Sequence, residues 1–158
     1  MEVFRGWTGD PEVAVYMMWN FHRSVAETKE WLSEEEAGAA KDGRCVWGFA
    51  LKETGRLIGS GGLILNEDRQ MFELGYCIMK EYRNRGLTTG AARAVIGFAV
   101  QRLGAYVFYA RRDKDNAASG RVPEKPGFIL LGNIDCQSLD GKRNIQGCEY
   151  TPRPGQGR

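Results

Sequence analysis

Residues 73–90 read ELGYCIMKEYRNRGLTTG and join two patterns of different period. The first half, up to Met79, has the apolar character of a strand, and a helix is predicted to begin at Gly86. Free N–H groups and the positive dipole end at a helix start bind anions, and Gly86 lets the backbone approach a phosphate closely. Arg83 and Arg85 add guanidinium donors to the same turn. The stretch therefore predicts a pyrophosphate site, with a solvated basic turn as the alternative.

The residues around this turn narrow the kind of phosphate ligand. Thr88 and Thr89 place hydroxyls in the first helical turn, but the lysine of a P-loop is absent, which disfavours a nucleoside triphosphate. A second glycine-rich stretch, Gly59, Gly61 and Gly62, falls inside an expected strand. We therefore interpret those three glycines as positions of close strand packing rather than as a phosphate loop.

Outside this stretch, the period of apolar residues separates helices from strands. The expected helices span residues 11–40 and 86–103, and the expected strands span 44–52, 57–65, 71–79, 105–110, 128–132 and 144–150. The first three strands form an antiparallel meander, with Gly55 in its first turn. The second helix is expected to be buried on a broad apolar surface that includes Ala94 and Phe98. This pattern predicts one α+β (mixed α/β) domain over residues 1–158, with a polar tail from about residue 151.

The composition excludes several classes of function. The chain has 158 residues and a net charge of +2, which is too small to indicate a nucleic-acid partner. It contains no apolar run of the length that a membrane helix needs. Four cysteines without a CxxC pair and a single histidine give no support for a zinc site, so no metal is expected. The cysteine usage and the absence of a leader-like start favour the cytoplasm.

Several motifs, in order along the chain, resemble one enzyme family. Arg83-Asn-Arg-Gly-Leu-Thr88, after a strand that contains Glu-Leu-Gly-Tyr, resembles the R/Q-x-x-G-x-G/A motif of the GNAT superfamily of acyl-CoA N-acyltransferases. Asn116-Ala-Ala-Ser119 and Glu124-Lys-Pro-Gly-Phe128 are similar to the N-x-x-S and E-K-x-G-F signature of its ribosomal-protein N-terminal acetyltransferases of the Rim type. Asp10-Pro-Glu-Val and Thr28-Lys-Glu-Trp-Leu32 also look like that branch.

The resemblance implies a GNAT-like, mostly antiparallel sheet that splays beside a bound acetyl-CoA, the co-substrate. The strand end would expose backbone groups that pair with the pantetheine arm as an added strand does. The turn and helix start would hold the pyrophosphate, Asn116 would bond the pantetheine, Ser119 would lie near the thioester sulfur, and Lys125 near the nucleotide. The implied cofactor-binding residues are Ile78, Met79, Arg83, Asn84, Arg85, Gly86, Leu87, Thr88, Thr89, Gly90, Asn116, Ser119 and Lys125.

Acetyl transfer to a primary amine needs a neutral amine, a stabilised oxyanion and a protonated leaving thiolate. Glu73 is the candidate base, directly or through a water, and its alternative role is a strand carboxylate facing an arginine. Ser119 is the candidate acid, because relatives in another branch place a tyrosine where this chain has Pro123. Tyr109 and Tyr150 are second choices for the acid, and the oxyanion donor would be a backbone N–H near Ile78–Met79.

The acceptor is expected to be a protein N-terminus or a small amine such as a polyamine, an amino acid or an aminoglycoside. Trp19, Asn20, His22 and the loop 66–70 are expected to line its side of the site. The acidic run 34–36 would attract a cationic acceptor or form an exposed helix face.

The chain also departs from the family pattern. Thr88 replaces a small residue and Gly90 replaces a glutamate, while Pro123 and Pro126 fall in and after a helix that Pro123 would bend. The first strand of the family and most of its first helix have no counterpart before Asp10, so either the first residues fold differently or another subunit covers the exposed sheet edge. On that ground we expect a homodimer. These departures keep a non-catalytic acyl-CoA-binding or assembly module as the alternative function. A nucleotide-binding module ranks third, and the mixed-charge run 111–115 is interpreted as a solvated loop.

Overall fold

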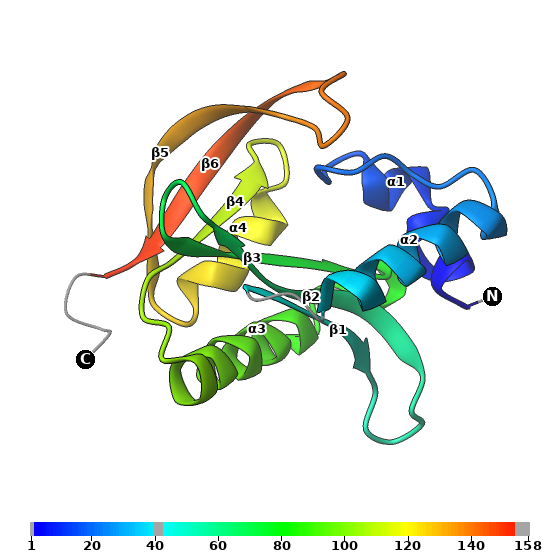
Figure 1. The fold of residues 1–158 in the computed structure, drawn as a ribbon, viewed down its shortest axis with the longest axis horizontal. Coiled ribbons are helices and arrows are strands. Elements are labelled where there is room, and N and C mark those ends of the chain that lie inside the picture. The colour runs from blue at the N-terminus through cyan, green and yellow to red at the C-terminus, as the bar shows by residue number, and fades with distance from the viewer. Residues whose placement is uncertain (1, 40–42, 154–158) are drawn as a thin grey trace.

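The computed structural model describes residues 2–39 and 43–153 (Figure 1). Its helices are η1 (Phe4–Thr8), α1 (Pro11–Ala14), α2 (Val25–Ala39), η2 (Lys80–Tyr82), α3 (Leu87–Phe98), η3 (Ala99–Leu103) and α4 (Ala117–Glu124). Its strands are β1 (Arg44–Ala50), β2 (Leu57–Asn66), β3 (Met71–Ile78), β4 (Phe108–Asp113), β5 (Phe128–Gln137) and β6 (Asn144–Pro152). No helix in the described part of the chain is both long and apolar enough to span a bilayer.

The strands form one sheet in the order β1-β2-β3-β4-β6-β5, in which only β3 and β4 run parallel. Strand β3 pairs with β2 along its whole length, from Met71 to Ile78. On its other side it pairs with β4 at only three positions, Phe72–Leu74. The sheet therefore splays after Leu74 and leaves one edge of β3 open. This mixed, mostly antiparallel sheet with flanking helices confirms the predicted fold class.

The helices cover the two faces of the sheet with separate cores. On one face α3 and α4 pack on Leu63, Leu74 and Phe108. On the other face η1, α1 and α2 lie over Ile58 and Cys77. Figure 1 shows α1 and α2 on the side of the sheet that is opposite α3. A ligand in the splay therefore has a different set of side chains on each face.

Three expected elements differ from the structure in more than length, and β5 extends to Gln137, five residues beyond its expected end at Gly132. The helix expected over 11–40 is two helices, because Asp10 caps α1 and the chain turns irregularly from Val15 to Ser24 before α2 begins. Strand β4 begins at Phe108, three residues later than expected, and extends to Asp113. The run expected as a loop over 111–115 thus lies partly in the sheet, where Arg111 pairs with the Glu73 carboxylate and Arg112 donates to the Tyr150 hydroxyl.

The third difference concerns the helix expected over 86–103. Its buried side chains include Ala92, Val95 and Ala99, whereas Ala94 and Phe98 are exposed. The apolar surface of α3 is therefore only partly covered, and it forms a groove with Trp47 on the edge strand β1. A broad apolar stripe does not require that the sheet cover all of it.

The three strand glycines have the structural role that was expected. A Cβ atom at Gly59, Gly61 or Gly62 would collide with the backbone of the neighbouring strands. These residues lie inside β2 and not at a helix start, so they form no phosphate loop. The turn glycine Gly55 has a positive φ of 70° as its hairpin requires.

Candidate active site

The turn that precedes α3 is built for close approach of an anion. Gly86 is the N-cap residue with φ = 76°, and Asn84 also has a positive φ of 60°. No side chain caps the helix. The first helical hydrogen bond runs from the Gly90 N–H to the Gly86 oxygen at 3.0 Å. The N–H groups of Leu87–Thr89 therefore precede that bond and have no partner within the helix, as the first N–H groups of any helix lack one.

This hydrogen bond corrects one expectation. Gly90 was expected among the residues that hold the pyrophosphate, but its N–H is used inside α3. The side chains nearby are arranged as follows: Arg85 lies over the Tyr82 ring at 5.5 Å, Thr89 is buried, and Arg83 and Thr88 are half-buried. The N–H groups left without a helical partner at this helix start are thus those of the first three helical residues, Leu87–Thr89.

The open edge of β3 ends directly before this turn. The Met79 N–H donates to the Ile58 oxygen of β2 at 2.8 Å, and the Phe72 N–H donates to the Val107 oxygen on the other side at 3.0 Å. Successive residues of a strand direct their N–H groups to opposite sides. The backbone of Tyr76 and Ile78 therefore faces the splay. Met79, expected as a second exposed residue here, has its N–H engaged in the sheet.

The carboxylate of Glu73 is fully engaged on the α2 face of the sheet. Arg111 donates to it through Nε at 2.9 Å and through Nη2 at 2.6 Å, and the Tyr109 hydroxyl donates to Oε2 at 2.8 Å. The structure therefore has the ion pair that was the alternative role for Glu73. About a quarter of the Glu73 side chain remains exposed, at 26%. Tyr109 lies on the same face of the sheet as these charges, and therefore not on the α4 face where Ser119 lies.

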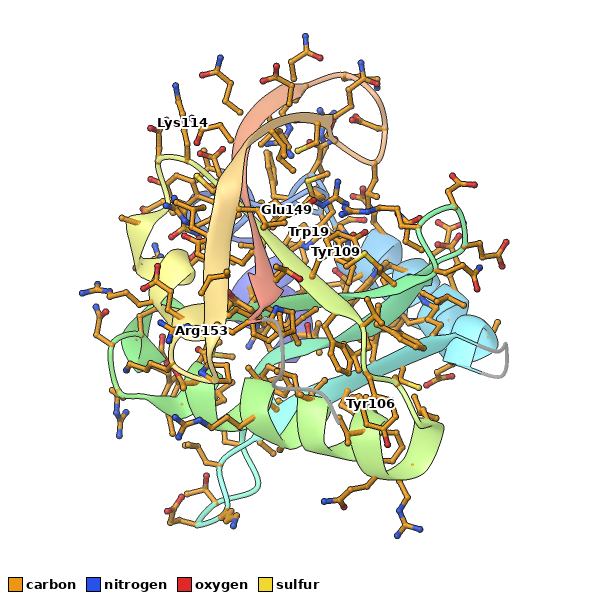
Figure 2. All side chains as sticks on the ribbon, turned by 90° about the vertical axis from the view of Figure 1, so that its left-hand side faces the viewer. Trp19, Tyr106, Tyr109, Lys114, Glu149 and Arg153 are labelled. Atoms are coloured by element: carbon orange, nitrogen blue, oxygen red, sulfur yellow. The ribbon has the colours of Figure 1, made fainter. Side chains whose placement is uncertain are left out.

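A second ion pair continues this network toward β6. Arg69, in the loop 66–70, donates to both oxygens of Glu149 at 2.7 and 2.8 Å, and it lies 4.3 Å above the Tyr109 ring. Arg69 holds the pKa of the Glu149 carboxyl below its usual range. Figure 2 shows Tyr109 and Glu149 on adjacent strands. The sequence analysis anticipated the loop but not Glu149, although a carboxylate inside a buried strand signals a partner.

The α4 face of the splay carries the N-x-x-S residues. Asn116 is the N-cap of α4, and its Oδ1 accepts from the Ser119 N–H at 3.3 Å. Ser119 Oγ donates to the Tyr76 hydroxyl at 3.3 Å, and that hydroxyl donates to the Ser119 backbone oxygen at 2.9 Å. Burial raises the pKa of Tyr76 to about 12, so its hydroxyl stays protonated. Lys125 is exposed at the end of α4, where its backbone oxygen accepts from Arg93 at 3.1 Å.

Tyr150 also lies on the α4 face, but its hydroxyl has a different hydrogen-bond partner. Its hydroxyl accepts from Arg112 Nε at 2.9 Å, and a Cβ at Gly120 would come within 2.5 Å of the same hydroxyl. Helix α4 therefore sits directly on Tyr150, and the tyrosine packs under the helix as an aromatic strand residue commonly does.

On the α2 face, the β5–β6 turn is bonded to the loop after α1, an arrangement that we call the acceptor bridge (residues 15–24 and 138–143). Arg143 donates to the oxygens of Val15, Met17 and Trp19 at 3.3, 2.8 and 3.1 Å. The bridge also contains hydrogen bonds from the Leu139 N–H to the Met18 oxygen and from Asn20 to Asp140, each 2.7 Å long. Figure 1 shows the turn reaching this loop.

His22 differs from the expectation that it lines the acceptor side. It is 8% exposed, its Nδ1 lies 2.8 Å from the Thr28 hydroxyl, and that hydroxyl lies 2.9 Å from the Thr8 hydroxyl. The histidine therefore joins η1 to α2 inside the protein. Trp19 packs against the same core, and Figure 2 shows it in the part of the molecule that holds Tyr109.

Comparison with known proteins identifies this architecture. A family profile described as an acetyltransferase (GNAT) domain matches residues 1–129. The chain belongs to the GNAT family of acetyltransferases. The GNAT chain is therefore an acetyl-CoA-dependent acetyltransferase, which confirms the family and the enzyme class that the motifs predicted.

Individual proteins share the sequence or the fold of the chain. The GNAT chain is 30% identical to the uncharacterised protein YkkB of Bacillus subtilis over 123 residues, which are 75% of this chain and 69% of YkkB. A GNAT-family acetyltransferase from Bacillus anthracis superposes with a TM-score of 0.76 and 19% identity, covering 92% of this chain and 83% of that one. The spermidine N-acetyltransferase of Vibrio cholerae, solved with CoA and spermine, superposes with a TM-score of 0.74 and 15% identity. The match covers 94% of this chain and 85% of that one.

Proposed function

We propose that this GNAT acetyltransferase moves an acetyl group from acetyl-CoA to the nitrogen of a primary amine. The observation that carries the proposal is the junction of β3 and α3, where an uncapped helix start with a left-handed Gly86 follows directly on the open strand edge at Ile78. Acetyl-CoA has an extended arm with hydrogen-bonding amides and a pyrophosphate at the end of that arm. The arm matches the open strand edge, and the pyrophosphate matches the helix start.

The residues present fit acetyl-CoA, which would supply the acetyl thioester. The backbone of Tyr76 and Ile78 would pair with the pantetheine arm, and the side-chain amide nitrogen of Asn116 would add a donor to it. The pyrophosphate would be held by the turn and first helical residues, Arg83, Asn84, Arg85, Gly86, Leu87, Thr88 and Thr89. Lys125, exposed beyond α4, would lie near the nucleotide. The Ile78 N–H, which faces the splay, would donate to the developing oxyanion.

The amine must lose its proton on the α2 face. Both Glu73 oxygens already accept hydrogen bonds from Arg111 or Tyr109, and about a quarter of the side chain, 26%, is exposed to solvent. We therefore propose that Glu73 accepts the proton through a water, while Arg111 fixes the carboxylate in place. On the opposite face the carbon–sulfur bond breaks with its electron pair on sulfur. Ser119 gives its hydroxyl proton to that sulfur and regains one from solvent, which balances the proton lost by the amine.

The charges on the α2 face indicate the kind of amine. The two strand carboxylates on this face, Glu73 and Glu149, are each paired with an arginine, so neither offers an unpaired negative charge to an amine. A related structure is a spermidine N-acetyltransferase, but a polycation gains little from neutralised carboxylates. We therefore propose a small monoamine as the acceptor, ahead of a polyamine or a protein N-terminus.

The test combines binding and turnover. Calorimetry with acetyl-CoA, CoA and ATP is expected to show binding of the first two only. Release of free thiol is then measured with a panel of monoamines, polyamines and peptides. Binding of acetyl-CoA without thiol release from any amine would support the alternative, a non-catalytic acyl-CoA-binding module. A Glu73→Gln variant is expected to lower kcat most near neutral pH, where the amine is protonated, and less at alkaline pH, where the amine loses its proton unaided. An active variant with the wild-type pH profile would exclude Glu73 as the base.

A further inference from the structure

The helix that carries Ser119 contains a proline, and this proline removes one helical hydrogen bond. Pro123 lies inside α4 and is fully buried. A proline has no N–H, so it cannot donate to the oxygen four residues earlier, which here belongs to Ser119. A backbone oxygen left without a donor in the protein interior is costly and is normally paired by another group.

The side chain of Tyr76 supplies that missing donor. Tyr76 lies in the middle of the open edge of β3, and its hydroxyl donates to the Ser119 backbone oxygen at 2.9 Å. The same hydroxyl accepts from Ser119 Oγ at 3.3 Å. One tyrosine therefore holds both the backbone and the side chain of Ser119, and it does so from the strand along which the thioester would lie.

The surrounding contacts fix this arrangement. The next residue, Gly120, lies so close to the sheet that a Cβ there would come within 2.6 Å of Arg112 Nε. Asn116 holds the Ser119 N–H from the other side at 3.3 Å. The first turn of α4 is thus pinned at Asn116, Tyr76 and Gly120. Among these contacts, only the one to Tyr76 bears on the direction of the Ser119 hydroxyl.

We infer that Tyr76 is a positioning residue for acetyl transfer: it replaces the hydrogen bond lost at Pro123 and holds the Ser119 Oγ on the α4 face of the splay, from which the Ser119 hydroxyl turns to the leaving sulfur. This inference rests on the proposed function. It also explains how the chain keeps an ordered N-x-x-S segment although Pro123 interrupts the helix. Tyr76 is not assigned contact with the substrate; it acts through Ser119.

The first test is a double-mutant cycle on turnover, with Tyr76→Phe, Ser119→Ala and both together. Loss of a positioned proton donor is expected to lower kcat at least about tenfold in each variant, with the acetyl-CoA Kd within about twofold of wild type. The double variant is expected to lose no more than either single one, because the two hydroxyls act as a unit. An unchanged kcat for Tyr76→Phe, or losses that multiply, would overturn the inference.

The second test separates positioning from simple support of the helix. Pro123→Ala restores an N–H that can donate to the Ser119 oxygen, so Tyr76→Phe combined with Pro123→Ala is expected to regain the stability lost by Tyr76→Phe. Its kcat is expected to stay low, because Ser119 Oγ still lacks its partner. Recovery of kcat would show that Tyr76 only supports the helix and would refute its positioning role.

These outcomes are distinct from a failure of the proposed function. If the wild-type protein binds acetyl-CoA and releases no thiol with any amine, both the function and the inference are refuted. If the wild-type protein is active and Tyr76→Phe matches it, only the inference is refuted. If Tyr76→Phe alone does not fold, Ser119→Ala and the variant with Pro123→Ala carry the comparison.

Discussion

Two glycines in and before α3 allow backbone conformation to be tested apart from packing. A Cβ at Gly90 meets no atom within 4 Å, and neither does one at Gly86. Gly90 is an exposed helical residue, whereas Gly86 has a φ of 76°. Replacement by alanine at either position therefore adds a methyl group to open space. The two substitutions differ only in how the backbone conformation at that position affects the free energy of unfolding.

The expected effects have opposite signs. Glycine in a helix is about 1 kcal/mol less favourable than alanine, so Gly90→Ala is expected to stabilise the protein by up to about 1 kcal/mol. For a chain of this size, that corresponds to an increase in Tm of about 2–4 °C. At Gly86, the left-handed conformation costs an alanine about 1–2 kcal/mol, so Gly86→Ala is expected to destabilise.

The assay is urea unfolding followed by far-UV circular dichroism, with the free energy of unfolding taken at constant slope. Gly97→Ala is the matched control, because Gly97 also lies in α3 with open space around its Cβ, and it should stabilise like Gly90→Ala. A Gly90→Ala variant less stable than wild type, while Gly97→Ala behaves as expected, would refute the reasoning about the start of α3. Equal effects at Gly86 and Gly90 would refute the role of the positive φ.

Three further predictions concern other parts of the chain. Burial lowers the pKa of His22 below its usual value, so the unfolded chain takes up the proton at a higher pH than the folded protein does. The free energy of unfolding should therefore fall as the pH drops below about 6.5, and it should fall less in His22→Gln. Urea unfolding at several pH values measures both. Arg143→Ala should raise the KM for the amine severalfold and leave the KM for acetyl-CoA unchanged, whereas Lys142→Ala, 82% exposed in the same turn, should change neither. Sedimentation equilibrium should give twice the 17.7 kDa chain mass, and Trp47→Lys on the edge strand should halve it; a wild-type monomer would end the homodimer prediction.

The local pattern of the sequence was sufficient for the meander and for the turn before α3. Alternation of apolar residues located β1–β3 within two residues, and Gly86 stands directly before the helix that was predicted to begin there. These features depend on residues close together in the chain, so their periods and turn residues carry the information.

The polar networks could not be predicted in the same way, because their partners are far apart in sequence. Glu73 meets Arg111 across 38 positions, and Arg69 meets Glu149 across 80. The division of the first predicted helix has the same cause, since the irregular loop is held by Arg143. Pro123 was anticipated to bend its helix, but the hydroxyl that compensates for it comes from Tyr76 on a strand 43 positions away. Such pairings are fixed by the tertiary fold and not by local propensity.

The acceptor bridge has a consequence for how this protein is made. Its three hydrogen bonds from Arg143 reach back across 124 to 128 positions, nearly the whole length of the chain. During synthesis, the segment after α1 leaves the ribosome long before the β5–β6 turn exists, and domains complete their long-range contacts only when the last element is available. The bridge is therefore completed only after the β5–β6 turn has been synthesised, and every shorter nascent chain lacks it.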